Sequence, residues 1–121
     1  MPGSGKADIL VVDDDQAVLK MLSLIFTRKG YVTDLANSGH EAMEKLNTNR
    51  YRLVITDIKM PGISGTQILE YVKTEKQLHV PVVGMSGTPW LLQGEFDAVL
   101  SKPCTNEDLL KVIARTMRQS S

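Results

Sequence analysis

The sequence predicts an α/β fold with a five-stranded parallel sheet and helices packed on both of its faces. Short apolar runs rich in β-branched residues alternate along the chain with segments in which apolar residues recur every three or four positions. Parallel strands need a crossover connection, which is usually a helix, so this alternation indicates a parallel sheet. The runs contain few polar residues, as expected of strands buried on both faces.

Five apolar runs are the predicted strands. The first is Ile9–Val12, which ends abruptly in three aspartates, and the run at residues 53–56 ends in Asp57 in the same way. The others lie at residues 31–35, which is the weakest candidate, 80–85 and 98–100.

Helical spacing fills the intervals between these runs and follows the last one. The apolar positions are Val18, Leu22, Ile25 and Phe26; Ala42, Met43 and Leu46; Ile68, Leu69 and Val72; and Leu109, Leu110, Ile113 and Met117. Capping residues precede these segments and stop signals follow two of them. The caps are Asp15, Ser38, Ser64 and Thr105, and the stops are Gly30 and Asn49.

The interval between Ser86 and Lys102 departs from this regularity. Only 15 residues separate the two, and they include Pro89 and Gly94 without a long helical repeat. Proline and glycine both disfavour the interior of a helix. We therefore expect the fourth helix to be short or irregular.

Length and composition favour one ordinary globular domain. The chain has 121 residues, 14 basic and 14 acidic side chains and one cysteine. A zero net charge does not favour nucleic acid or an anionic membrane, and no apolar stretch approaches the roughly 20 residues that span a bilayer. We expect a soluble, cytoplasmic protein with a lead-in at residues 1–7 and its domain at 8–119.

Polar and charged side chains gather where the predicted strands end. In open α/β sheets this edge is where ligands bind. Carboxylates crowded there would repel one another, and a hard divalent ion such as Mg²⁺ relieves that repulsion. A lysine and a hydroxyl beside them suit phosphoryl transfer. The residues concerned are Asp13, Asp14, Asp57, Ser86 and Lys102.

The chain resembles the CheY-like receiver domains of bacterial two-component response regulators from about residue 8 to about residue 118. Four ordered blocks carry the resemblance: residues 9–14, 53–65, 83–87 and 102–103. The second block, LVITDIKMPGISG, is the most specific. The resemblance implies a doubly wound, flavodoxin-like (βα)₅ fold with strand order 2-1-3-4-5.

The resemblance also implies roles for individual residues. Asp57 would accept the phosphoryl group, Ser86 would move toward it, and Lys102 would hold it. The metal, Mg²⁺ or alternatively Mn²⁺, would be bound by Asp13, Asp14, Asp57 and the backbone carbonyl of Lys59. The Lys102–Pro103 peptide would be cis.

The implied partners are a histidine kinase or phosphotransfer protein and an effector domain or target protein. Phosphorylation-dependent homodimerisation stays open, and no direct contact with nucleic acid or membrane is expected. The resemblance implies a signalling domain rather than an enzyme, because its chemistry is limited to its own phosphorylation and dephosphorylation.

Two positions stand out against the family pattern. Val99 occupies a position where receivers commonly have the Tyr or Phe that moves on activation, so the usual aromatic switch is in question. Lys59 would place a positive charge at the mouth of the site, and we hypothesise that it alters the lifetime of the aspartyl phosphate. Three other reactive side chains have no metal-ligand spacing and are interpreted as incidental: His40, His79 and Cys104.

Two alternative functions fit parts of the sequence pattern. A pseudo-receiver would keep the fold as a docking or dimerisation module without phosphorylation. A haloacid-dehalogenase-like phosphatase would use Asp13 and Asp15 with Ser86 and Lys102. The second alternative leaves the block around Asp57 unexplained, and no acidic pair after a further strand follows Lys102.

Overall fold

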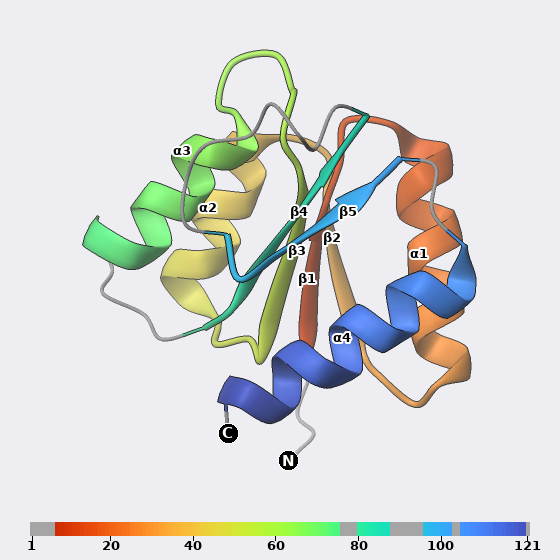
Figure 1. The fold of residues 1–121 in the computed structure, drawn as a ribbon. Coiled ribbons are helices and arrows are strands. Elements are labelled where there is room, and N and C mark those ends of the chain that lie inside the picture. Colours follow the sequence, from red (N-terminus) through yellow and green to blue (C-terminus); the bar gives the residue numbers. More distant parts are fainter. Residues whose placement is uncertain (1–6, 76–79, 88–95, 103–104, 121) are drawn as a thin grey trace.

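A computed structural model describes residues 7–75, 80–87, 96–102 and 105–120. Its five strands form one parallel sheet in the order β2-β1-β3-β4-β5, with helices on both faces (Figure 1). The predicted α/β class, parallel sheet and strand order are therefore confirmed.

The three central strands are buried along their whole length: β1 (Ile9–Val12), β3 (Leu53–Asp57) and β4 (Val82–Ser86). The edge strands, β2 (Thr33–Ala36) and β5 (Ala98–Ser101), are partly exposed. This difference explains why the central strands are mostly apolar in the sequence, since both of their faces meet a helical layer.

In the described part of the chain, helices lie on both faces of the sheet (Figure 1). Helices α1 (Gln16–Arg28) and α4 (Asn106–Ser120) lie on one face and share a core with alternate residues of the strands. Helices α2 (Gly39–Thr48) and α3 (Gly65–Glu70) cover the other face. Sequence periodicity predicted these four helices.

The predicted N-caps are confirmed, and they fix where each helix begins. The Asp15 side chain accepts a hydrogen bond from the Ala17 amide, and Thr105 accepts one from the Asp108 amide. Ser64 forms a reciprocal capping box with Gln67. Such caps satisfy amides that the first helical turn leaves without partners.

At α2 the cap bonds do not form the reciprocal capping box seen at α3. Ser38 Oγ accepts a hydrogen bond from the Glu41 amide, but the Glu41 carboxylate accepts one from the amide of Asn37 instead of Ser38. The two bonds still hold the turn between β2 and α2 in one conformation.

Some boundaries differ from the sequence predictions. Strand β2 begins at Thr33 instead of residue 31, and β4 begins at Val82 instead of residue 80. A π-helical turn, Tyr71–Glu75, continues α3 and was not predicted. The predicted irregular fourth helix and the predicted cis peptide before Pro103 both involve residues outside the described part of the chain.

Within the described residues, no helix combines the length and the apolar composition that crossing a membrane requires.

Candidate phosphoryl-transfer and metal site

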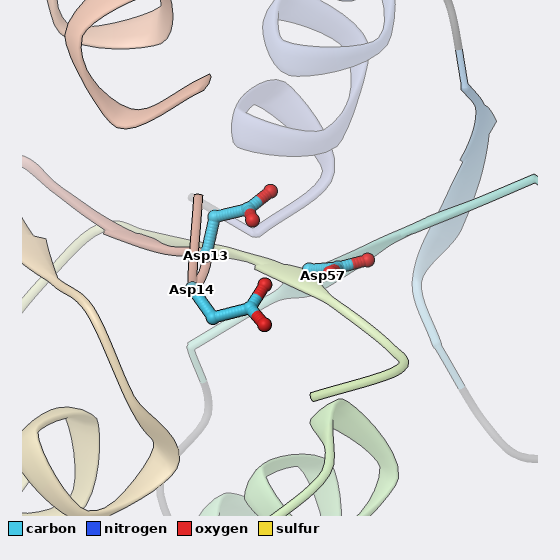
Figure 2. A group of neighbouring side chains, drawn as sticks. All are labelled: Asp13, Asp14 and Asp57. Atoms are coloured by element: carbon cyan, nitrogen blue, oxygen red, sulfur yellow. The ribbon is translucent and has the colours of Figure 1, made fainter. Parts of the chain in front are cut away.

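Three aspartates meet at the carboxyl edge of the sheet, as predicted. Asp13 and Asp14 follow β1, and Asp57 ends the neighbouring strand β3 (Figure 2). Each offers one carboxylate oxygen, and these three oxygens lie within 4.8 Å of one another. Among the described residues this is the one such group of acidic, histidine or cysteine side chains. All-oxygen donors at this spacing match the preference of a hard divalent cation.

Asp13 is the most buried member of the cluster, with 0% of its surface exposed. One of its carboxylate oxygens accepts a hydrogen bond from the Asp15 amide at 3.0 Å. The other lies 2.9 Å from Nζ of Lys102. Both oxygens therefore have partners, which is what a buried carboxylate requires.

Lys102 lies between two carboxylates. Its Nζ is 3.3 Å from Oδ1 of Asp57 and 2.9 Å from Oδ2 of Asp13. Burial by itself would lower the pKa of Lys102, but hydrogen bonds and the charges of Asp13 and Asp57 outweigh it and raise that pKa above its ordinary value. The ammonium group is therefore charged at neutral pH.

Burial raises the pKa of Asp57 above the ordinary value for aspartate, although Lys102 opposes this shift. The negative charges of Asp13 and Asp14 act in the same direction as burial. Because Lys102 lies closer to Asp13, its charge compensates Asp57 only in part. An additional cation beside Asp57 would remove the remaining cost of its ionisation.

A pocket of about 140 Å³ opens beside Asp57 and is lined by Asp57, Lys59, Ser86 and Gly87. Ser86 is buried at the end of β4, and its carbonyl accepts a hydrogen bond from the Lys102 amide at 2.8 Å. This bond brings Ser86 and Lys102 to the same end of the sheet. The structure thus brings together all the predicted side chains: Asp13, Asp14, Asp57, Ser86 and Lys102.

Gly65 and Thr56 support this arrangement and were not among the predicted site residues. The Gly65 amide donates to the Ile58 carbonyl at 2.9 Å, and a Cβ at position 65 would lie 2.5 Å from the carbonyl oxygen of Asp57. The Thr56 hydroxyl donates to that same carbonyl at 2.9 Å. A glycine directly after the cap of α3 was the only sequence signal of this close packing.

Asp15 caps α1 with its side chain, as predicted, and is not a member of the carboxylate cluster. Met60 is buried in the core beneath α2 and α3. Val99 lies on the edge strand β5 with 37% of its surface exposed.

The comparisons with known proteins agree with this geometry. Residues 9–114 match the response regulator receiver domain family, and the chain belongs to that family. Membership removes the dehalogenase-like phosphatase alternative.

Similar proteins include the transcriptional regulatory protein DltR of Streptococcus agalactiae, which is 31% identical over 93% of this chain and 53% of its own length. The polar-differentiation response regulator DivK of Brucella ovis is 25% identical over 87% of this chain and 91% of its own length. The high-resolution structure of the chemotaxis response regulator CheY4 of Vibrio cholerae superposes with a TM-score of 0.84 at 27% identity, covering 92% of this chain and 98% of that one.

The chain spans about half the length of the first curated relatives that it matches, as with the 53% of DltR. By fold and family, the chain is therefore a receiver domain of the two-component response regulator type. Receiver domains are signalling domains.

Proposed function

We propose that residues 8–119 form a phosphoacceptor receiver and that Asp57 accepts a phosphoryl group from a phosphohistidine of a partner protein. The supporting observation is the convergence of the Asp13, Asp14 and Asp57 oxygens within 4.8 Å, next to the Lys102 ammonium group. In the transfer, one Asp57 oxygen forms a bond to phosphorus while the phosphorus–nitrogen bond of the phosphohistidine breaks.

The donor set fits Mg²⁺, because it consists of carboxylates and each would otherwise repel the others. We propose Asp13, Asp14, Asp57 and the backbone carbonyl of Lys59 as its ligands, with Mn²⁺ as an alternative ion. When bound, the ion supplies positive charge that offsets the negative charge of the phosphoryl oxygens.

Lys102 and Ser86 act on the transferred group. We propose that the Lys102 ammonium, already 3.3 Å from Asp57, pairs with a phosphoryl oxygen once the group is attached. The Ser86 hydroxyl, in the wall of the adjacent pocket, would donate to another. A shift of Ser86 toward the phosphoryl group is the proposed first step in changing the surface conformation.

Partners follow from this chemistry. The donor would be a histidine kinase or a phosphotransfer protein, and the phosphorylated form would act on an effector domain or a separate target. Phosphorylation-dependent homodimerisation is a further proposal. DltR, named as a transcriptional regulator, is longer than this chain, which suits an effector domain in such proteins.

Labelling with acetyl phosphate tests the proposal, since this small donor needs no kinase. We expect the mass of the intact protein to increase by one phosphoryl group in Mg²⁺ and not in EDTA. Asp57→Asn should abolish labelling. Asp15→Asn, which changes only the cap of α1, should leave the extent of labelling unchanged. No labelling of the folded parent protein would support the pseudo-receiver alternative instead.

A further inference from the structure

Gly39, the first residue of α2, is packed directly against the loop between β3 and α3. A Cβ at position 39 would lie 2.5 Å from Cβ, 2.6 Å from Cγ2 and 2.7 Å from the carbonyl oxygen of Ile63. These distances leave no room for a side chain. Because one of the three atoms belongs to the backbone, rotating the Ile63 side chain cannot make that room.

The helix side of this contact is held firmly. The cap bonds of Ser38 and Glu41 fix the start of α2, and Ala42 is buried one turn later. The carbonyl of Ala36, the last residue of β2, accepts a hydrogen bond from the amide of Asp13 at 3.1 Å. The start of α2 is thus tied to the segment that carries the acidic pair.

The loop side is held at its two ends and by the buried side chain of Met60. The Gly65 amide donates to the Ile58 carbonyl and so joins the two ends, and backbone atoms of positions 65 and 57 are in close contact. Between these ends Lys59 and Gly62 are exposed, and Gly62 has a φ of 77°, a conformation that favours glycine. A side chain at position 39 would push Ile63 away, and we expect the exposed part of the loop, including Lys59, to shift with it while α2 stays in place.

We propose that Gly39 is a positioning residue for the metal site. Because Gly39 has no side chain, the loop can lie where the Lys59 carbonyl would reach the ion. This inference rests on the proposed function. Mg²⁺ requires near-ideal octahedral geometry with short ligand distances, so a displacement of a few tenths of an ångström in one ligand weakens binding. Gly39 acts through Ile63 and touches neither the ion nor the phosphoryl group.

Gly39→Ala is the direct test. Helix propensity alone favours alanine over glycine, so a purely local effect would stabilise the protein and leave Mg²⁺ binding unchanged. We expect the Mg²⁺ dissociation constant, measured by calorimetry, to rise on the order of tenfold, as is typical when a residue supporting a metal ligand is changed. The rate of acetyl phosphate labelling should recover at saturating Mg²⁺.

Two controls separate positioning from general stability. His40→Ala changes the neighbouring exposed residue of α2, and Leu46→Val weakens the core at the other end of the helix. Both should keep the parental Mg²⁺ constant in the folded protein. A parental constant in folded Gly39→Ala would overturn the inference.

A double-mutant cycle with Ile63→Gly completes the test. This change removes the two side-chain contacts at 2.5 and 2.6 Å but leaves the carbonyl at 2.7 Å. The Mg²⁺ dissociation constant of the Gly39→Ala/Ile63→Gly protein should be higher than that of Ile63→Gly. The ratio of these two constants should be smaller than the ratio between Gly39→Ala and the parent protein.

If Gly39→Ala does not fold, the comparison of the double variant with Ile63→Gly carries the test, and equal constants would overturn the inference. A parent protein that neither binds Mg²⁺ nor becomes labelled would instead refute the proposed function itself.

Discussion

The ammonium group of Lys102 lies closer to Asp13 than to Asp57, at 2.9 Å against 3.3 Å. Without a metal, Lys102 therefore compensates mainly the carboxylate that is fully buried. Asp57, the proposed phosphoacceptor, keeps a raised pKa and a carboxylate that opens onto the neighbouring pocket. This uneven sharing of one cation leads to opposite expectations for changes at positions 102 and 57.

Replacing Lys102 by methionine should destabilise the metal-free protein. The Asp13 side chain, 1% exposed, would lose its charged partner, and leaving such a group without one costs about 1–3 kcal/mol. Urea unfolding in EDTA measures this loss, with the exposed Lys20 of α1, changed to methionine, as the matched control. The loss should shrink in Mg²⁺. Equal stability of Lys102→Met and the parent in EDTA would contradict the role given to this pair.

Replacing Asp57 by asparagine should instead stabilise the metal-free protein, by roughly 1–2 kcal/mol, the scale of a single-site effect. Because the pKa of Asp57 is raised on folding, the folded state retains this proton at pH values where the unfolded state has lost it. The contribution of Asp57 to stability therefore falls as pH rises from about 3.9, the ordinary pKa of aspartate, through its raised pKa in the folded protein.

Unfolding series across pH check this expectation. In EDTA the advantage of Asp57→Asn over the parent should be absent at low pH and should grow as pH rises through that window. An advantage that is constant across pH would show that the burial of the charge is not its cause.

Lys59 lines the pocket beside Asp57 and is exposed to solvent. Truncating it in Lys59→Ala should open the pocket to water and shorten the lifetime of the aspartyl phosphate. Lys59→Met, which keeps most of the side-chain length without the charge, separates shielding from electrostatics. The decay of phosphorylated protein after removal of acetyl phosphate gives both rates. An unchanged rate in Lys59→Ala would rule out this role.

Gly84 and Gly87 form a matched pair of glycines on and just after β4. A Cβ at position 84 would lie 2.7 Å from Cδ1 of Ile58 and 3.1 Å from Cδ1 of Phe96, whereas one at position 87 has nothing within 4 Å. Gly84→Ala should cost about 1–3 kcal/mol of unfolding free energy, as overpacking does. Gly87→Ala should leave the urea midpoint nearly unchanged. Equal changes in unfolding free energy for the two variants would show that the side chains packed over β4 move aside at little cost.

The sequence was sufficient to predict which side chains converge, because the fold obeys a simple rule. In a parallel sheet the carboxyl ends of neighbouring strands share one edge, so residues that follow different strands, such as Asp13 and Asp57, converge there. Buried central strands are also easy to identify, because burial on both faces strongly favours apolar residues.

Features set by contacts between distant segments could not be predicted. Strand β2 lies at an edge of the sheet and is half-exposed. Backbone hydrogen bonds between Asp8 and Val32 lie next to its first residue. Its start is therefore set by hydrogen bonding and not by a pattern of apolar residues. The preference of Lys102 for Asp13 and the packing of Gly39 on Ile63 likewise depend on how separate loops meet. No local signal in the sequence foretold the π-helical turn after α3.

Locating the phosphoryl group within the chain tests the central claim most directly. After reaction with acetyl phosphate in Mg²⁺, borohydride reduction converts an aspartyl phosphate to homoserine, which fragment mass spectrometry can place. We predict homoserine at position 57 alone, and none when EDTA replaces Mg²⁺. Homoserine at position 13 or 14, or labelling that persists in EDTA, would contradict a metal-dependent phosphoacceptor at Asp57.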